Sequence, residues 1–215
     1  MKSAMRRILK LAAVLVATIL VSAAGPMYRP SEFTGPDLTD LIRVSDYLNS
    51  IHSMRGSFLQ IDPNGTSEQG AFYIVKPGKM RFEYQPPNPT LVVSDGKTVA
   101  VFNKQLNTVD SYPLYATPLN LLLSDNVKLQ NNQDVMGVTR QTGALIVYAK
   151  AGSTKQGSGG NITLTFSDAP LELRQWTIVD AQGLSTTVSL RNVQTGTDLP
   201  DEFFSLTGAK TEQAP

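Results

Sequence analysis

The sequence predicts a mainly β (α+β) fold in which about eleven short antiparallel strands form one large sheet. Apolar and polar residues alternate over many short stretches. These stretches recur at intervals of about a dozen residues, and turns rich in Gly, Pro, Asn and Asp separate them. Only two stretches show helical spacing. The pattern is typical of a barrel-like sheet or a sandwich, and one economical arrangement curls the sheet around the two helices.

The first 24 residues have the layout of a secretory signal peptide. Four basic residues precede the apolar run LAAVLVATILV at 11–21, and small residues follow it. A retained membrane anchor is the alternative, but this run is shorter than the roughly 20 residues that a membrane span needs. Cleavage near Ala23 or Ala24 removes only positive charges and changes the formal net charge from +1 to −3. We therefore expect an exported protein.

Length and composition predict one globular domain with a sizeable core. The chain has 215 residues, of which 41% are hydrophobic and 17% charged. Its near-neutral charge gives no sign of a nucleic-acid-binding surface. The absence of cysteine excludes disulfides, thiolate metal sites, a cysteine nucleophile and a lipidated N-terminal cysteine. We predict a flexible linker at 25–36, a domain at 37–207 and a polar tail at 208–215.

Two helices are predicted. The first begins at Asp37, which can cap its first turn, and ends near Ser50 or His52. Its apolar residues predict an amphipathic helix of about four turns. The second begins at Thr117-Pro118, where the threonine hydroxyl can cap the helix and proline suits the first helical position. This helix is apolar on most sides, so it must be buried.

The remaining elements are predicted as hairpins. Asp95-Gly96 is the strongest hairpin signal in the chain. A flexible loop is expected at 151–160 and a single helical turn at 201–204. The strands are expected at 57–61, 70–76, 80–84, 91–94, 98–102, 108–112, 135–139, 145–150, 162–167, 171–179 and 186–193.

Candidate catalytic groups are few. His52 is the only histidine, and no G-x-S-x-G nucleophile motif accompanies it. A hydrolase base also needs an orienting carboxylate and an oxyanion hole, so we interpret His52 as a surface residue at a helix end. The segment 62–68 resembles a calcium loop only loosely, because it lacks an acidic residue at the twelfth position. No catalytic, metal or cofactor site is therefore predicted.

Four segments, taken in order, resemble the periplasmic outer-membrane lipoprotein carrier family (LolA-like). The segment SFLQ at 57–60 resembles the family's S-F-x-Q signature, and KPGKMRFEY at 76–84 resembles its R-P-G-x-x-R-W-E-Y hairpin. The segment LVVSDGKT at 91–98 is similar to L-V-S-D-G-K-T, and TPL at 117–119 to the start of the second helix. The order and spacing agree from about Asp37 to Leu206.

The resemblance implies an unclosed antiparallel β-barrel with a lid of short helices over an apolar cavity. It also implies a monomeric, non-enzymatic periplasmic chaperone without a cofactor, which shields lipoprotein acyl chains and moves lipoproteins from the inner to the outer membrane. Its partners would be an inner-membrane lipoprotein-releasing ABC transporter and an outer-membrane lipoprotein receptor. A lipid-binding or lipoprotein-sensing module on the same fold is the main alternative, and a secreted hydrolase around His52 is a weaker one.

The resemblance also assigns site residues. Leu48, Phe82, Leu119 and Leu122 match cavity-facing positions of the family. From the residues alone, these leucines could fill a cavity or form an ordinary core, and the ordinary core is the favoured interpretation. Lys76 stands where the family has an arginine that tethers the lid to the barrel. A lysine is a single donor group on a flexible stem, so we expect a looser lid or a different closing interaction.

Overall fold

The computed structural model describes residues 33–151 and 160–211, all within one compact unit, residues 31–215. The predicted signal peptide, the linker up to residue 32 and most of the predicted loop at 151–160 lie outside the described residues.

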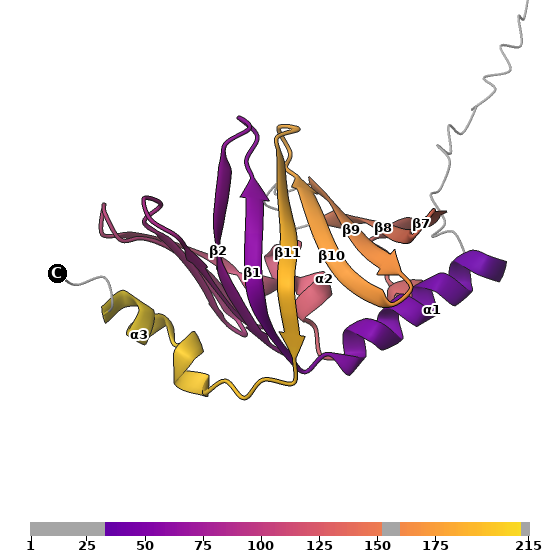
Figure 1. The fold of residues 1–215 in the computed structure, drawn as a ribbon, viewed down its shortest axis with the longest axis horizontal. Coiled ribbons are helices and arrows are strands. Elements are labelled where there is room, and N and C mark those ends of the chain that lie inside the picture. Colours follow the sequence, from indigo (N-terminus) through magenta and orange to yellow (C-terminus); the bar gives the residue numbers. More distant parts are fainter. Residues whose placement is uncertain (1–32, 152–159, 212–215) are drawn as a thin grey trace, which may run out of the picture. The chain divides into compact units, whose positions relative to one another are not determined.

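Eleven strands form a single antiparallel sheet, as predicted (Figure 1). Their order is β6-β5-β4-β3-β2-β1-β11-β10-β9-β8-β7, so β1 pairs with β11 at the centre and β6 and β7 are the two edges. The sheet is therefore curved but not closed into a barrel. The strands are β1 Ser53–Ile61, β2 Ser67–Val75, β3 Lys79–Tyr84, β4 Thr90–Asp95, β5 Thr98–Asn103, β6 Thr108–Pro113, β7 Val135–Gln141, β8 Ala144–Ala151, β9 Gly160–Asp168, β10 Leu171–Val179 and β11 Ser185–Thr195.

The first helix, α1, spans Gly35–Ser50 and begins within the predicted linker. Asp37 lies in the first turn rather than at the cap. In the first turn its negative charge interacts favourably with the positive end of the helix dipole. Leu41, Val44 and Leu48 are buried, and the helix packs against β7 and β10. The amphipathic pattern thus faces the sheet as predicted.

Residues 114–134, which we call the crossing segment, connect the two edge strands β6 and β7. This segment contains η1 Leu114–Ala116, the one-turn helix α2 Asn120–Leu123, and η2 Leu129–Asn131. The helix starts later than predicted, with Leu119 at its N-cap. Thr117 does not cap it, because its hydroxyl donates to the Leu114 carbonyl at 2.8 Å.

The two faces of the sheet carry separate apolar clusters. The inner face, toward α1 and α2, carries the main core, while the outer face of β4 and β5 carries a smaller cluster built on Leu91, Val93 and Phe102. The predicted helical turn at 201–204 is present as η3 Asp201–Phe204, and α3 Leu206–Thr211 follows it. The tail predicted from residue 208 begins within α3, where Ala209 is only 1% exposed and packs in the outer cluster.

Candidate functional site

The four side chains expected to line a cavity all belong to, or pack against, the main apolar core. Leu48 from α1, Phe82 from β3 and Leu122 from α2 are 3%, 6% and 6% exposed and belong to one apolar cluster, against which the half-buried Leu119 packs. In this conformation they pack in the core beneath α1 and α2. Open pockets of about 590 and 430 Å³ lie instead around the loop 85–90, and neither is lined by these four side chains.

Aromatic rings surround Phe82. Its ring centroid lies 5.0 Å from that of Phe58, 5.8 Å from Phe72 and 6.0 Å from Trp176. Phe58 in turn contacts Tyr84, whose hydroxyl donates to a Gln60 side-chain oxygen at 2.6 Å. Burial raises the pKa of Tyr84 well above its ordinary value. The result is a buried cluster of aromatic rings in which edge-to-face and stacked contacts predominate.

Sequence reasoning missed three of these rings. Phe58, Phe72 and Trp176 lie on inward positions of β1, β2 and β10, which alternate with solvent-facing positions. The alternation alone identifies a buried face. It does not say which buried residues of distant strands meet, because that depends on the curvature of the whole sheet.

Lys76 contacts α1 directly. Its Nζ donates to the Leu48 carbonyl at 2.9 Å. That carbonyl lies in the last turn of α1, where carbonyls have no partner within the helix. Burial lowers the pKa of Lys76, and the nearby Asp125 carboxylate opposes that shift. This hydrogen bond joins the β2–β3 turn to the backbone of α1.

A second contact, missed from the sequence, joins the same β2–β3 turn to α2. The Gly78 N–H donates to the Leu123 carbonyl at 2.8 Å, again at a helix C-terminus. Gly78 has a φ of +77°, and a Cβ there would lie 2.7 Å from the Cα of Gly96. The fully buried Ser94 hydroxyl donates to the Gly78 carbonyl at 2.7 Å. The K-P-G and S-D-G motifs thus build one anchoring turn together.

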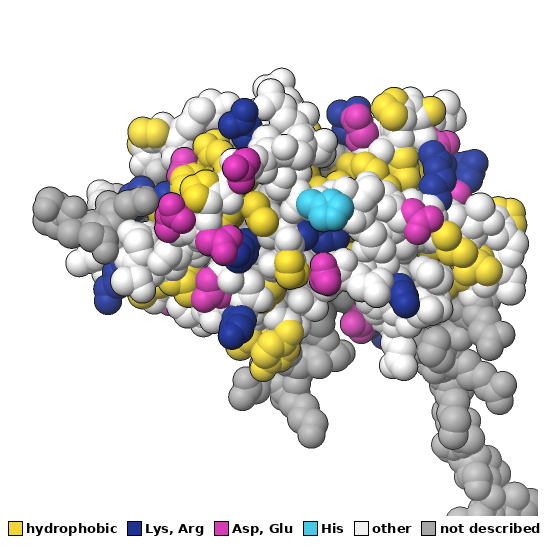
Figure 2. Space-filling view, turned by 90° about the horizontal axis from the view of Figure 1, so that it is seen from below, with side chains coloured by type: hydrophobic (Ala, Val, Ile, Leu, Met, Phe, Trp, Pro, Cys, Tyr) yellow, Lys and Arg dark blue, Asp and Glu magenta, His cyan; other side chains and the backbone are white. Residues whose placement is uncertain are grey.

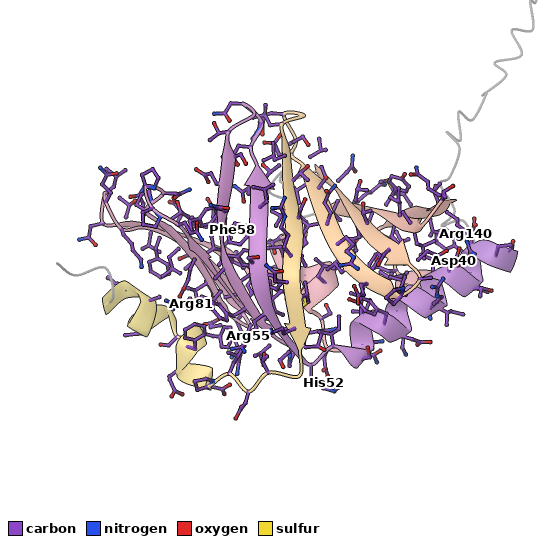
Figure 3. All side chains as sticks on the ribbon, in the orientation of Figure 1. Asp40, His52, Arg55, Phe58, Arg81 and Arg140 are labelled. Carbon is purple, nitrogen blue, oxygen red and sulfur yellow. The ribbon has the colours of Figure 1, made fainter. Side chains whose placement is uncertain are left out.

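The His52 side chain lies away from the aromatic cluster around Phe82. It is exposed, as Figure 2 shows, and its Nδ1 is 3.1 Å from the Ser50 carbonyl oxygen. Figure 3 places it where α1 ends and β1 begins, distant from Phe58. Within residues 33–151 and 160–211, no three His, Asp or Glu side chains are grouped to hold a metal ion. The same residues contain no helix long and apolar enough to cross a membrane.

Comparison with known proteins gives consistent matches. The family model described as "Outer membrane lipoprotein carrier protein LolA" matches residues 49–207. An outer-membrane lipoprotein carrier protein of Dechloromonas aromatica (strain RCB) is 28% identical over 176 residues, covering 77% of this chain and 82% of its own. Another, from Pseudomonas syringae pv. syringae (strain B728a), is 26% identical over 203 residues, covering 91% and 94%. A solved LolA superfamily protein of Nitrosomonas europaea aligns with a TM-score of 0.41 at 9% identity, over 80% of this chain and 99% of its own.

Proposed function

Since this chain belongs to the LolA family of outer membrane lipoprotein carrier proteins, we propose that it binds the acyl chains of lipoproteins beneath α1 and α2 and carries them from the inner to the outer membrane. The family is one of carriers rather than enzymes, and we assign no catalytic step to the protein. We place it in the periplasm, as a monomer exported by its N-terminal segment. An inner-membrane lipoprotein-releasing ABC transporter would load it, and an outer-membrane lipoprotein receptor would unload it.

The observation that carries this proposal is the apolar cluster around Phe82 beneath two helices. A lipoprotein cannot cross water unaided, because exposing one sixteen-carbon acyl chain costs roughly 12 kcal/mol. A cluster closed by helices offers a sheath without a permanently exposed apolar surface. Loading then exchanges contacts between side chains for contacts with the acyl chain, so the net binding energy stays small enough to permit release.

The proposal is tested with the transporter in proteoliposomes and a triacylated lipoprotein as cargo. We expect the mature protein to move the lipoprotein into the soluble fraction, where native mass spectrometry should detect the complex. Phe82→Glu places a charge in the apolar cluster and should abolish this release. Leu106→Glu is the matched control, since Leu106 is 69% exposed, and should release cargo normally. Cargo that stays with the membranes at every carrier concentration would refute the carrier role.

A further inference from the structure

The helix α1 is attached at both ends. At its C-terminal end, two residues connect it to β1. Toward its N-terminus, Asp40 forms an ion pair with Arg140 of β7, and the two side chains point toward each other in Figure 3. Between these points, Arg43 forms an ion pair with Asp168 at 2.6 Å. These attachments to both halves of the sheet make α1 a fixed element.

The middle of the crossing segment, residues 117–128, is held differently. We call these residues the gate. They contain one helical turn, and Leu119 and Leu121 on it are only half-buried. A pocket of about 110 Å³ lies between the gate and the start of β7, lined by Asn120, Leu121 and Asp134 among others. Incomplete packing on this side lowers the free energy needed to displace the gate.

Hydrogen bonds join the gate to α1 through one side chain. The Asn49 side chain donates from Nδ2 to the Val127 carbonyl at 2.9 Å and accepts from the Val127 N–H on Oδ1 at 2.8 Å. Just beyond the gate, the buried Ser45 hydroxyl accepts from the Leu129 N–H at 3.0 Å. The middle of the gate is held by the Gly78 N–H, which donates to the Leu123 carbonyl. The gate is thus held near its C-terminal end by a side chain of α1 and in its middle by the β2–β3 turn.

We propose that the gate is the part that moves to admit an acyl chain while α1 stays in place, and that Asn49 is the positioning residue that holds the gate shut. Its two hydrogen bonds satisfy both backbone groups of Val127 at once. Displacing the gate uncovers Leu122 and Leu123, whose contacts with the core an acyl chain can replace. The admitted ligand rests on the proposed function, whereas the movement of the gate can be measured without any ligand.

The first experiment measures amide hydrogen exchange of the ligand-free protein by NMR. Asn49→Ala should speed exchange of the Gly78 amide on the order of tenfold, because two hydrogen bonds holding the gate are lost. Asn49 does not bond Gly78, so this effect must pass through the gate. Amides within α1 should keep their rates. Ser50→Ala is the matched control, since the Ser50 hydroxyl bonds only within α1, to the Tyr47 carbonyl. Unchanged exchange at Gly78, or equal acceleration throughout α1, would overturn the proposal.

Global destabilisation is separated by two further measurements. Urea unfolding of Asn49→Ala measures the change in overall stability. This change is then compared with the changes in exchange rate of the amides in α1 and in the gate. Asn49→Asp keeps an acceptor for the Val127 N–H but loses the donor to its carbonyl, so it should give a smaller acceleration at Gly78 than Asn49→Ala. Equal effects of the two variants would contradict the role of the amide group.

The second experiment uses the absence of native cysteine. Cysteines replacing Asn49 and Val127 are cross-linked with a short bismaleimide, and uptake of a synthetic triacylated lipopeptide is followed. Cross-linking the gate should block uptake. Cross-linking cysteines at Arg43 and Asp168, which joins α1 to the sheet, should leave it unchanged. Lipopeptide uptake by the protein with a cross-linked gate would overturn the proposal that the gate must move. A wild-type protein that takes up no lipopeptide would instead refute the proposed function, while the exchange experiment would still test the gate.

Discussion

Replacing Lys76 by methionine should loosen the contact between the β2–β3 turn and α1. Methionine has a similar length but cannot donate a hydrogen bond, so the Leu48 carbonyl loses the bond it accepts at 2.9 Å. Hydrogen bonds to charged groups contribute about 1.5–3 kcal/mol. Partial burial of the ammonium offsets part of this gain, as its lowered pKa indicates. We therefore expect a net loss of about 1 kcal/mol, which for a domain of this size lowers Tm by about 2–4 °C.

Thermal and urea unfolding measure this loss, and Lys79→Met is the matched control. Lys79, the first residue of β3, directly follows the same turn but pairs with the exposed Asp201 carboxylate, and surface pairs contribute about 0–1 kcal/mol. Cargo transfer is then compared between the two variants. Lys76→Met should bind lipopeptide but change the rate of loading or handover. If its Tm and its transfer rates equal those of Lys79→Met, the reasoning about Lys76 is wrong.

The lowered pKa of Lys76 adds a dependence on pH. Between the lowered folded-state pKa and the ordinary lysine pKa of 10.5, the unfolded chain binds more protons at this site than the folded protein does. Stability contributed by this site therefore rises as pH increases through that window. The difference in unfolding free energy between wild type and Lys76→Met should shift in favour of wild type toward pH 10.5. A difference that stays constant from neutral pH to pH 10.5 would contradict the burial of a charged amine.

Three further predictions concern the sheet, the cluster and the histidine. Gly70→Ala should destabilise the fold by about 3 kcal/mol or more, because the new Cβ would lie 2.0 Å from the Glu83 carbonyl oxygen; Gly137→Ala, where a Cβ meets nothing within 4 Å, should be near neutral in the same urea titration. Phe82→Ala should lower the unfolding free energy by about 3–5 kcal/mol and weaken lipopeptide binding in native mass spectrometry, and retention of both would remove Phe82 from the site. His52→Ala should leave cargo transfer unchanged, and a loss of transfer in a stably folded variant would reopen the hydrolase alternative.

The strands could be predicted because their signals are local. The strand expected at 171–179 has the same bounds as β10, and the Asp95-Gly96 turn joins β4 to β5 as its residues indicate. Alternation with a period of two and the conformational needs of tight turns act over a few residues. The mainly β class and the number of strands therefore followed from the sequence alone, as did the outward position of His52.

Only the tertiary structure decided where the C-terminal residues pack and which hydrogen bonds hold the helices. Ala209 is buried in a helix rather than exposed in a tail only because β4 and β5, about a hundred residues earlier, present an apolar outer face to it. The Gly78–Leu123 and Asn49–Val127 bonds end on backbone groups. Backbone N–H and C=O groups are the same at nearly every residue, so the pattern of side chains does not predict which backbone groups form these bonds. The sequence determined a large antiparallel sheet and two apolar helices, and only the folded chain determined how the sheet curves and which groups hold those helices in place.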